Sequence, residues 1–175
     1  DRKLKLSWTK VKGAQGYDVF FKTCKGKESY ILVKSTVKLS CTVANLSRNK
    51  AYRAYVAAWK MSGGRKQYIG DHSPILHAIT GGYTKAWCNA GSVKLDKRSL
   101  ALKVGKTRTL KATVKGVKSG RELLQHARLV RYYSSDRNVA TVTKGGKVKA
   151  VGKGTCTIYA IANNGVRDSV KVTVK

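Results

Sequence analysis

Three histidines, His72, His77 and His126, carry the side chains best suited to acid–base catalysis in this chain. A hydrolytic triad or a Cys–His pair would need one of them in a pocket beside a nucleophile. His72 and His77 fall in the segment that closes the first half of the chain, His126 falls in a polar insertion, and the Gly-x-Ser-x-Gly pattern of a nucleophile elbow is missing. We therefore predict no catalytic residue and a protein that is not an enzyme.

The four cysteines do not have the close spacing of a zinc site. A disulfide between Cys24 and Cys41 can be considered, but strand alternation points Cys41 inward and leaves Cys24 facing outward at a strand end. We predict a buried free thiol at Cys156 and favour a free thiol over a bridge at Cys88. The eight acidic residues are scattered singly, which argues against a calcium site. We predict no metal and no cofactor.

Exposed aromatic and cationic residues are the remaining candidates for a functional role, which would be the binding of a ligand. The candidate ligand-binding residues are Trp59, Tyr83, Trp87, Arg121 and Arg128. The aromatic ones lie at a strand end and in a connecting segment, where they could stack on sugars or bases. The two arginines belong to a basic insertion over residues 115–128. In the alternative that we prefer, the aromatics pack at the junction of two domains and fix the angle between them.

The charge of the chain is its most unusual bulk property. It has 37 Lys and Arg against 8 Asp and Glu, a net charge of +29, and 42% hydrophobic residues, enough for a core. This charge exceeds what solubility requires, so we predict a polyanionic partner, an anionic cell-wall polymer or a surface glycan. Nucleic acid is disfavoured because no binding motif for it occurs. The longest apolar stretch, residues 54–59, is far shorter than the ~20 residues of a membrane span.

The elements that must position these residues are short strands separated by turns. Residues 3–6 and 170–175 alternate Lys with Leu or Val, which places the lysines on the solvent face of strands. Glycine pairs and the run Asn163-Asn164-Gly165 suit hairpin turns. A single helical turn is expected near residues 121–125. The pattern predicts an all-β fold of two tandem immunoglobulin-like β-sandwiches: residues 1–82, a linker over 83–90, and residues 91–175.

The first segment resembles a bacterial fibronectin type III domain. The resemblance rests on Trp8 in the first strand, the run Gly13-Ala14-Gln15-Gly16-Tyr17-x-Val19, and Leu46 followed six residues later by Tyr52. The Leu46–Tyr52 spacing resembles a tyrosine corner, in which the phenol bonds to backbone and joins the two sheets. A complete domain of this family has a strand A before the Trp strand, and we expect that strand to be missing here.

The second segment resembles a bacterial immunoglobulin-like domain of group 2. It carries Leu102-Lys103-Val104-Gly105-Lys106-Thr107, the run from Tyr133 to Val142, the run from Gly146 to Thr155, and a closing Val170-Lys171-Val172-Thr173-Val174. It departs from the family in having Tyr133 where Trp is frequent, and in the basic insertion. Cys156 stands where the family has a small inward-facing residue.

The order of the two resemblances, with Lys-rich strands, is similar to that in cell-surface proteins of Firmicutes. It implies an extracellular, cell-surface or cell-wall module joined to other domains of a larger surface protein. We therefore predict a non-catalytic structural and adhesive segment that spaces or tethers such a protein at the anionic cell wall. The alternative is a specific glycan- or host-protein-binding module that uses the linker aromatics and the basic insertion.

Overall fold

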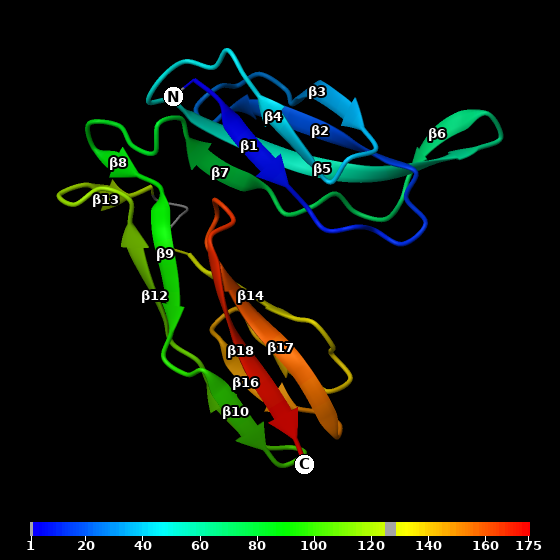
Figure 1. The fold of residues 1–175 in the computed structure, drawn as a ribbon, viewed down its shortest axis with the longest axis vertical. Helices are drawn as coiled ribbons and strands as arrows, with labels where there is room; N and C mark the ends of the chain where they lie inside the picture. Colours follow the sequence, from blue (N-terminus) through cyan, green and yellow to red (C-terminus); the bar gives the residue numbers. More distant parts are fainter. Residues whose placement is uncertain (1, 125–128) are drawn as a thin grey trace. The chain divides into compact units, whose positions relative to one another are not determined.

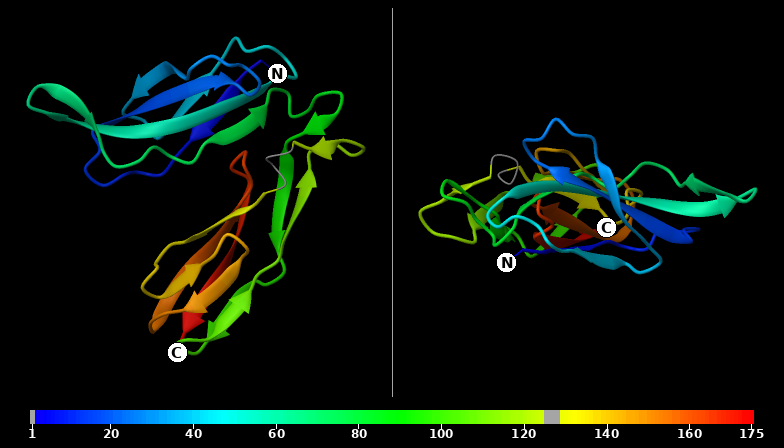
Figure 2. Two further views of the ribbon diagram at one scale, coloured as in Figure 1. Left: turned by 180° about the vertical axis from the view of Figure 1, so that it is seen from behind. Right: turned by 90° about the horizontal axis from the view of Figure 1, so that it is seen from above.

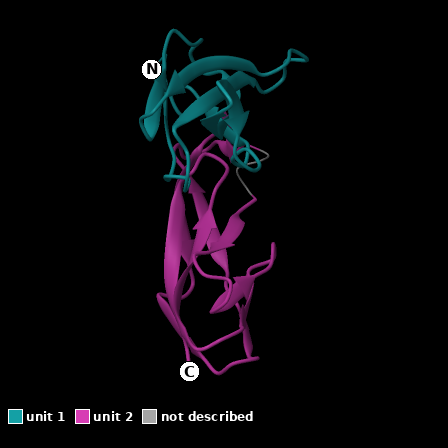
Figure 3. Cartoon of the chain, turned by 90° about the vertical axis from the view of Figure 1, so that its right-hand side faces the viewer, with its two compact units in different colours: residues 1–86 teal, residues 87–175 magenta. Residues whose placement is uncertain are grey.

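The chain is an all-β protein made of two compact units. The computed structural model describes residues 2–124 and 129–175, and these residues form eighteen strands and no helix. Residues 1–86 make up unit 1 and residues 87–175 make up unit 2 (Figure 3). Trp87 and Cys88, which fall in the segment predicted to link two domains, are thus the first strand of unit 2. Arg128 and His126 lie outside the described residues.

Unit 1 consists of two sheets that face each other across an apolar core (Figures 1 and 2). Its strands are β1 (Leu4–Ser7), β2 (Gly16–Thr23), β3 (Ile31–Thr36), β4 (Ser40–Val43), β5 (Ala51–Ser62), β6 (Arg65–Tyr68) and β7 (Leu76–Ile79). One sheet has the order β3-β2-β5-β6, with β7 also paired to β5, and the other consists of β1 and β4. All the pairings in unit 1 are antiparallel.

The core of unit 1 follows from the alternation along its strands. Val19 and Phe21 on β2 face Leu6 on β1, while Tyr52 and Ala54 supply the inner face of β5. The residues between them point to the other side of the sheet, because successive side chains in a strand alternate. Cys41 and Val43 of β4 pack against this core, as the alternation predicts.

Unit 2 is a second β-sandwich and is built from four small sheets. Its strands are β8 (Trp87–Cys88), β9 (Ala90–Leu95), β10 (Ser99–Leu102), β11 (Thr107–Thr109), β12 (Ala112–Gly116), β13 (Glu122–Leu123), β14 (Arg131–Ser134), β15 (Ala140–Val142), β16 (Lys147–Ala150), β17 (Gly154–Ile161) and β18 (Arg167–Val174). A four-stranded sheet has the order β10-β18-β17-β14, and a three-stranded sheet has the order β11-β16-β15. Two further pairs, β12-β9 and β13-β8, complete the unit.

The core of unit 2 lies between these sheets. Ile158 of β17 and Val172 of β18 are fully buried against Val148 of β16 from the three-stranded sheet. The hairpin of β17 and β18 pairs eight residues on each side, from Gly154 with Val174 to Ile161 with Arg167. This hairpin fixes which side chains of the four-stranded sheet face inward and which face solvent.

Candidate binding surfaces

The sequence-predicted ligand residues fall in different places. Trp59 lies on β5 and Tyr83 lies between β7 and β8, both in unit 1. Trp87 lies on β8, and Arg121 directly precedes β13, both in unit 2. They therefore do not all belong to one compact unit.

Trp87 and the basic insertion lie on neighbouring strands. β13, from the insertion, pairs in parallel with β8, so that Glu122 stands opposite Trp87 and Leu123 opposite Cys88. The backbone N–H of Leu124 donates to the carbonyl of Cys88 at 2.9 Å. The helical turn expected from residue 121 is replaced, over the described residues, by this strand. The pairing with β8 satisfies the backbone groups that a helical turn would have bonded internally.

Cys88 is completely buried where β8 meets the insertion. Its sulfur lies 3.7 Å from the carbonyl oxygen of Arg121, and it leaves no room for a side chain at Gly116, where a Cβ atom would lie 2.4 Å from the sulfur. All four cysteines are free thiols. A buried thiol at Cys88 thus fastens the insertion to β8 by packing.

Trp59 lies on the outer face of the five-stranded sheet of unit 1. It stands directly opposite Gly16 of β2, and a Cβ atom at residue 16 would lie 2.2 Å from the indole ring. The absence of a side chain at Gly16 therefore lets the indole lie across β2. On the ring, the Lys66 ammonium lies 4.6 Å from the centroid, at the distance of a cation–π contact. The Trp59 side chain therefore packs between Gly16 and Lys66 and is half-buried.

A buried carboxylate organises the same face. The Lys66 ammonium donates to both carboxylate oxygens of Asp18 at 3.0 Å, and the Tyr68 hydroxyl donates to one of them at 2.9 Å. Burial alone would raise the pKa of Asp18, but hydrogen bonds from Ser35, Lys66 and Tyr68 outweigh it and hold the pKa below its ordinary value. The network ties β6 to β2 across β5.

Beside Asp18, an aromatic cluster that the sequence analysis missed covers the sheet. The Phe20 and Tyr55 rings stack with centroids 4.8 Å apart, and Tyr30 and His72 lie 4.8 and 4.3 Å from Tyr55. Tyr68 closes the cluster edge-on to Phe20. The signal was present in the sequence, because the alternation that sends Val19 and Phe21 inward sends Phe20 outward.

The Cys24 thiol and the His77 imidazole are in contact. Cys24 Sγ lies 3.5 Å from His77 Nδ1. Burial raises the pKa of the Cys24 thiol, and the nearby Arg53 only partly offsets this effect. A nucleophilic cysteine has a lowered pKa, whereas the pKa of the Cys24 thiol is raised.

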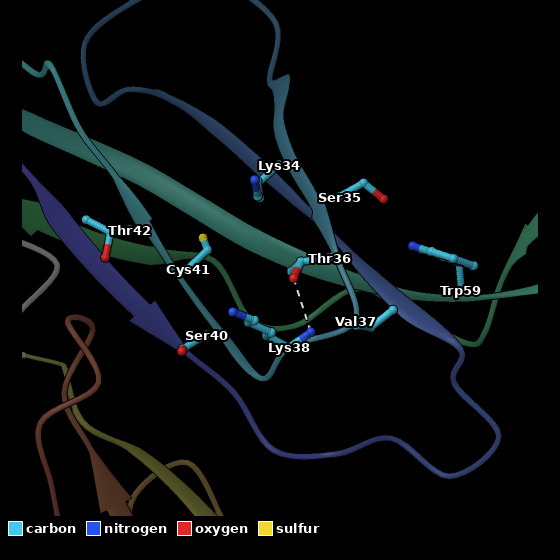
Figure 4. A pocket seen from close by; sticks show the side chains of 9 residues that line it. All are labelled: Lys34, Ser35, Thr36, Val37, Lys38, Ser40, Cys41, Thr42 and Trp59. Atoms are coloured by element: carbon cyan, nitrogen blue, oxygen red, sulfur yellow. Dashed lines mark hydrogen bonds between the residues drawn. The ribbon is translucent and has the colours of Figure 1, made fainter.

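A hollow of about 760 Å3 opens between β3 and β4 (Figure 4). Its lining residues are Lys34, Ser35, Thr36, Val37, Lys38, Ser40, Cys41, Thr42 and Trp59. The volume is in the range of small-molecule sites, and the lining combines hydroxyl groups and lysines with the apolar surfaces of Val37, Cys41 and Trp59. The backbone N–H of Lys38 donates to Thr36 Oγ1 at 3.1 Å and fixes the turn.

Several acidic residues are engaged in local structure. Asp168 accepts the backbone N–H of Leu95 at 2.8 Å and pairs with Arg98 at 3.2 Å. Asp96 accepts the backbone N–H of Lys111, and Asp136 accepts that of Asn138. With 37 Lys and Arg against 8 acids, most cations have no carboxylate to pair with. Both units therefore present positive charge to solvent.

The four residues predicted to have structural roles lie in or beside the two cores. Trp8 is half-buried, with its ring 5.6 Å from that of Tyr17. The Tyr52 hydroxyl accepts the backbone N–H of Ser47 at 3.0 Å, and Leu46 packs against the same core. This is the geometry of a tyrosine corner. Cys156 is buried in unit 2, with its sulfur 3.9 Å from Ser134 Oγ.

No cluster of three or more His, Cys, Asp or Glu suited to a metal ion occurs within residues 2–124 and 129–175. The same part of the chain holds no helix with the length and apolar character that crossing a bilayer requires.

The fold and these surfaces define a protein of tandem immunoglobulin-like β-sandwiches. Residues 90–174 match the family model of the bacterial Ig-like domain (group 2). This match confirms the resemblance predicted for the second segment. The fibronectin type III resemblance of the first segment stays a prediction. No curated protein sequence matches the chain.

Comparison with solved structures found matches over all or part of the chain. A crystal structure of FN3tt is 26% identical over 46% of this chain and 77% of its own, with a TM-score of 0.35. The C-terminal 282-residue fragment of intimin, solved with the intimin-binding domain of the translocated intimin receptor, is 17% identical over 99% of this chain, with a TM-score of 0.34. The surface layer protein SbsC, domains 1–6, is 15% identical over 99%, with a TM-score of 0.35. The chain spans 57% of the intimin fragment and 39% of the SbsC fragment.

Proposed function

We propose that this chain is a non-catalytic structural and adhesive segment of a bacterial surface protein, which spaces or tethers that protein at an anionic cell wall. The observation that carries the proposal is a bacterial Ig-like domain whose few carboxylates are engaged in its own backbone and ion-pair contacts, while most of its cations face solvent. An extracellular position, at the cell surface or in the wall, fits this composition. The other domains of a larger surface protein are the partners expected beside it.

The physical basis of the tether is long-range attraction. A surface with many unpaired lysines and arginines attracts a polyanion at low salt, and the attraction weakens as ions screen it, with a Debye length of about 10 Å at 0.1 M and about 3 Å at 1 M. The hydrogen-bonded strand pairs of the two sandwiches, such as the eight-residue pairing of β17 with β18, would resist extension. They would thereby maintain the distance between the cell wall and the rest of the surface protein.

Binding to isolated Gram-positive cell walls, with and without teichoic acid, tests the tether across a salt series. We expect retention that needs the anionic polymer and is lost by about 1 M salt, where the Debye length is about 3 Å. The double variant Lys147→Ala, Lys149→Ala, with both lysines exposed on β16, should elute at lower salt. Retention that depends on neither the salt concentration nor the anionic polymer, or the absence of retention, would contradict the proposed electrostatic tether.

A second candidate is a specific glycan- or host-protein-binding module. It is supported by the pairing of β8 with β13, which brings Trp87 beside the basic insertion with Arg121. Such a site would show saturable binding that survives moderate salt and is lost in Trp87→Ala. Arg121→Ala is a smaller change at the exposed end of the same strand pair and should weaken binding without affecting folding.

A further inference from the structure

The outer face of the four-stranded sheet in unit 2 carries a set of side chains with a common chemistry. On β14, β17 and β18 the inward positions are filled by buried residues such as Ile158, Ala160 and Val170. The outward positions are set by the register. One row across the sheet is Arg131, Ile161 and Arg167, and the next is Tyr133, Tyr159 and Ser169. A third row holds Thr157 and Lys171, with Ser99 of β10 beyond them.

These rows define a compact surface, which we call the Tyr–Arg face: Ser99, Arg131, Tyr133, Thr157, Tyr159, Ile161, Arg167, Ser169 and Lys171. Neighbouring strands lie about 4.8 Å apart and alternate residues about 7 Å apart along a strand, so Arg131 and Arg167 stand about 10 Å apart at the backbone. The Tyr133 and Tyr159 rings lie in the middle row, between the row of Arg131 and Arg167 and the row of Thr157 and Lys171, with centroids 6.3 Å apart. All these groups can reach one extended ligand.

Arg167 is oriented by its neighbour. Its guanidinium carbon lies 5.3 Å from the centroid of the Tyr159 ring, which restricts the long side chain and leaves its N–H groups for a ligand. The ring of Tyr133 stays open, since this residue is 57% exposed. An oriented guanidinium next to an open aromatic ring suits a ligand that combines an anionic group with a flat or apolar surface.

Arg131 adds a positive charge that has no counter-ion among the described residues. It is half-buried, and this burial lowers the pKa of its guanidinium. Asp168, between two residues of the face, points to the opposite side of β18, where it pairs with Arg98. No carboxylate stands in the three rows. An anionic ligand would therefore find hydrogen-bond donors and no competing carboxylate on this face. It would also neutralise the positive charge of Arg131.

We propose that the Tyr–Arg face is a binding site for an acidic polysaccharide, whose carboxylate or sulfate groups bind to Arg131 and Arg167 while a sugar ring packs on Tyr133. The hydroxyl groups of Ser99, Thr157 and Ser169 suit a ligand that carries hydroxyl groups along its length. A single open ring among many hydroxyl groups favours sugars over nucleic acid, which needs successive free aromatic platforms. This site is discrete and does not rest on the diffuse wall tether.

The test uses the whole chain and compares four probes: hyaluronan oligosaccharides with carboxylates, heparin oligosaccharides with sulfates, polyphosphate as charge without sugar, and single-stranded DNA. Isothermal titration calorimetry at 0.15 M salt gives the affinities. We expect hyaluronan or heparin to bind more tightly than the other two. NMR shifts should concentrate on β14, β17 and β18. The preferred glycan shows which anionic group the face selects.

Variants that retain the positive charge distinguish a specific binding site from non-specific electrostatic attraction. Arg167→Lys retains the positive charge but loses the planar fork and its packing on Tyr159, so we expect glycan affinity to fall at least tenfold. Tyr133→Ala should lower it several-fold and Tyr133→Phe should not. The matched control is Lys147→Ala with Lys149→Ala, which removes two charges from a different sheet of the same unit and should change the affinity less than twofold.

The proposal would be overturned by any of three results: no glycan binding, equal affinity for polyphosphate or DNA, or full affinity in Arg167→Lys. Circular dichroism confirms that each variant is folded. Wall retention and glycan binding can fail separately. Loss of wall retention in the double lysine variant alone concerns the tether, and loss of glycan binding in Arg167→Lys alone concerns the Tyr–Arg face.

Discussion

Asp18 and Lys66 form a partly buried ion pair in which the ammonium lies 3.0 Å from both carboxylate oxygens. The carboxylate is 1% exposed, in the middle of the five-stranded sheet. Lys66 comes from β6, on the far side of β5, so the pair joins two strands that are not neighbours. The same lysine also covers Trp59. One carboxylate therefore holds both the β5–β6 hairpin and the position of a predicted ligand residue.

Asp18→Asn should destabilise unit 1 in a pH-dependent manner. Because the pKa of Asp18 is lowered in the folded state, its contribution is present above the ordinary pKa and is lost as pH falls through the folded value. We expect a loss of about 1–3 kcal/mol at pH 7, the range for a hydrogen-bonded charged group, and a smaller loss at pH 2. Urea unfolding at both pH values measures this. Asp71→Asn, at an exposed carboxylate, is the control. An equal loss at both pH values would contradict the role of the charge.

Tyr52→Phe should lower the stability of unit 1 by about 1 kcal/mol, the typical contribution of one hydrogen bond. The variant keeps the ring, which stacks on Phe21, but removes the acceptor for the Ser47 N–H. Tyr133→Phe removes a hydroxyl from an exposed tyrosine and should leave stability unchanged. Thermal unfolding followed by circular dichroism compares the two. If both variants unfold with the wild-type midpoint, the corner bond does not contribute to stability.

Gly146→Ala should destabilise unit 2 much more than Gly165→Ala. Both glycines have positive φ, +80° and +88°, so each substitution strains the backbone by about 1 kcal/mol. At Gly146 the added Cβ would also lie 2.6 Å from the Leu110 carbonyl oxygen, whereas nothing lies within 4 Å at Gly165. The close contact should raise the total loss above about 2 kcal/mol. Denaturant midpoints that move equally for both variants would show that the contact relaxes freely.

Thiol reactivity should divide the cysteines into two groups. Cys88 and Cys156 are 0% and 4% exposed and should resist a thiol reagent until the chain unfolds. Cys24 and Cys41 are half-buried and should react in the native state. Since burial raises the pKa of both thiols above 9.0, their rates should still increase above pH 9. Mass spectrometry after timed labelling identifies the sites. Native-state labelling of Cys88 would contradict its packing against Gly116.

Much of the fold could be predicted because its signals are local. Alternation identified the inward side of β1, β4 and β18, and the Leu46–Tyr52 spacing indicated a corner. The candidate ligand residues were harder, because their neighbours come from distant parts of the chain. Trp59 is covered by Lys66, and Trp87 meets Glu122 through a parallel pairing. Binding by Trp59, Tyr83, Trp87 and Arg121 stays a prediction.

The sequence by itself determined that the chain is all-β, which face of its alternating strands is apolar and that its surface is basic. These properties depend on the period of two along each strand and on composition, and both are contained in short stretches. Only the tertiary structure decided which strands pair and in which register. The register of these strands places Arg131 and Arg167 in one row, on either side of Ile161. It places Asp168 on the opposite face of the sheet. Register depends on how two sheets pack together, so no single strand encodes it.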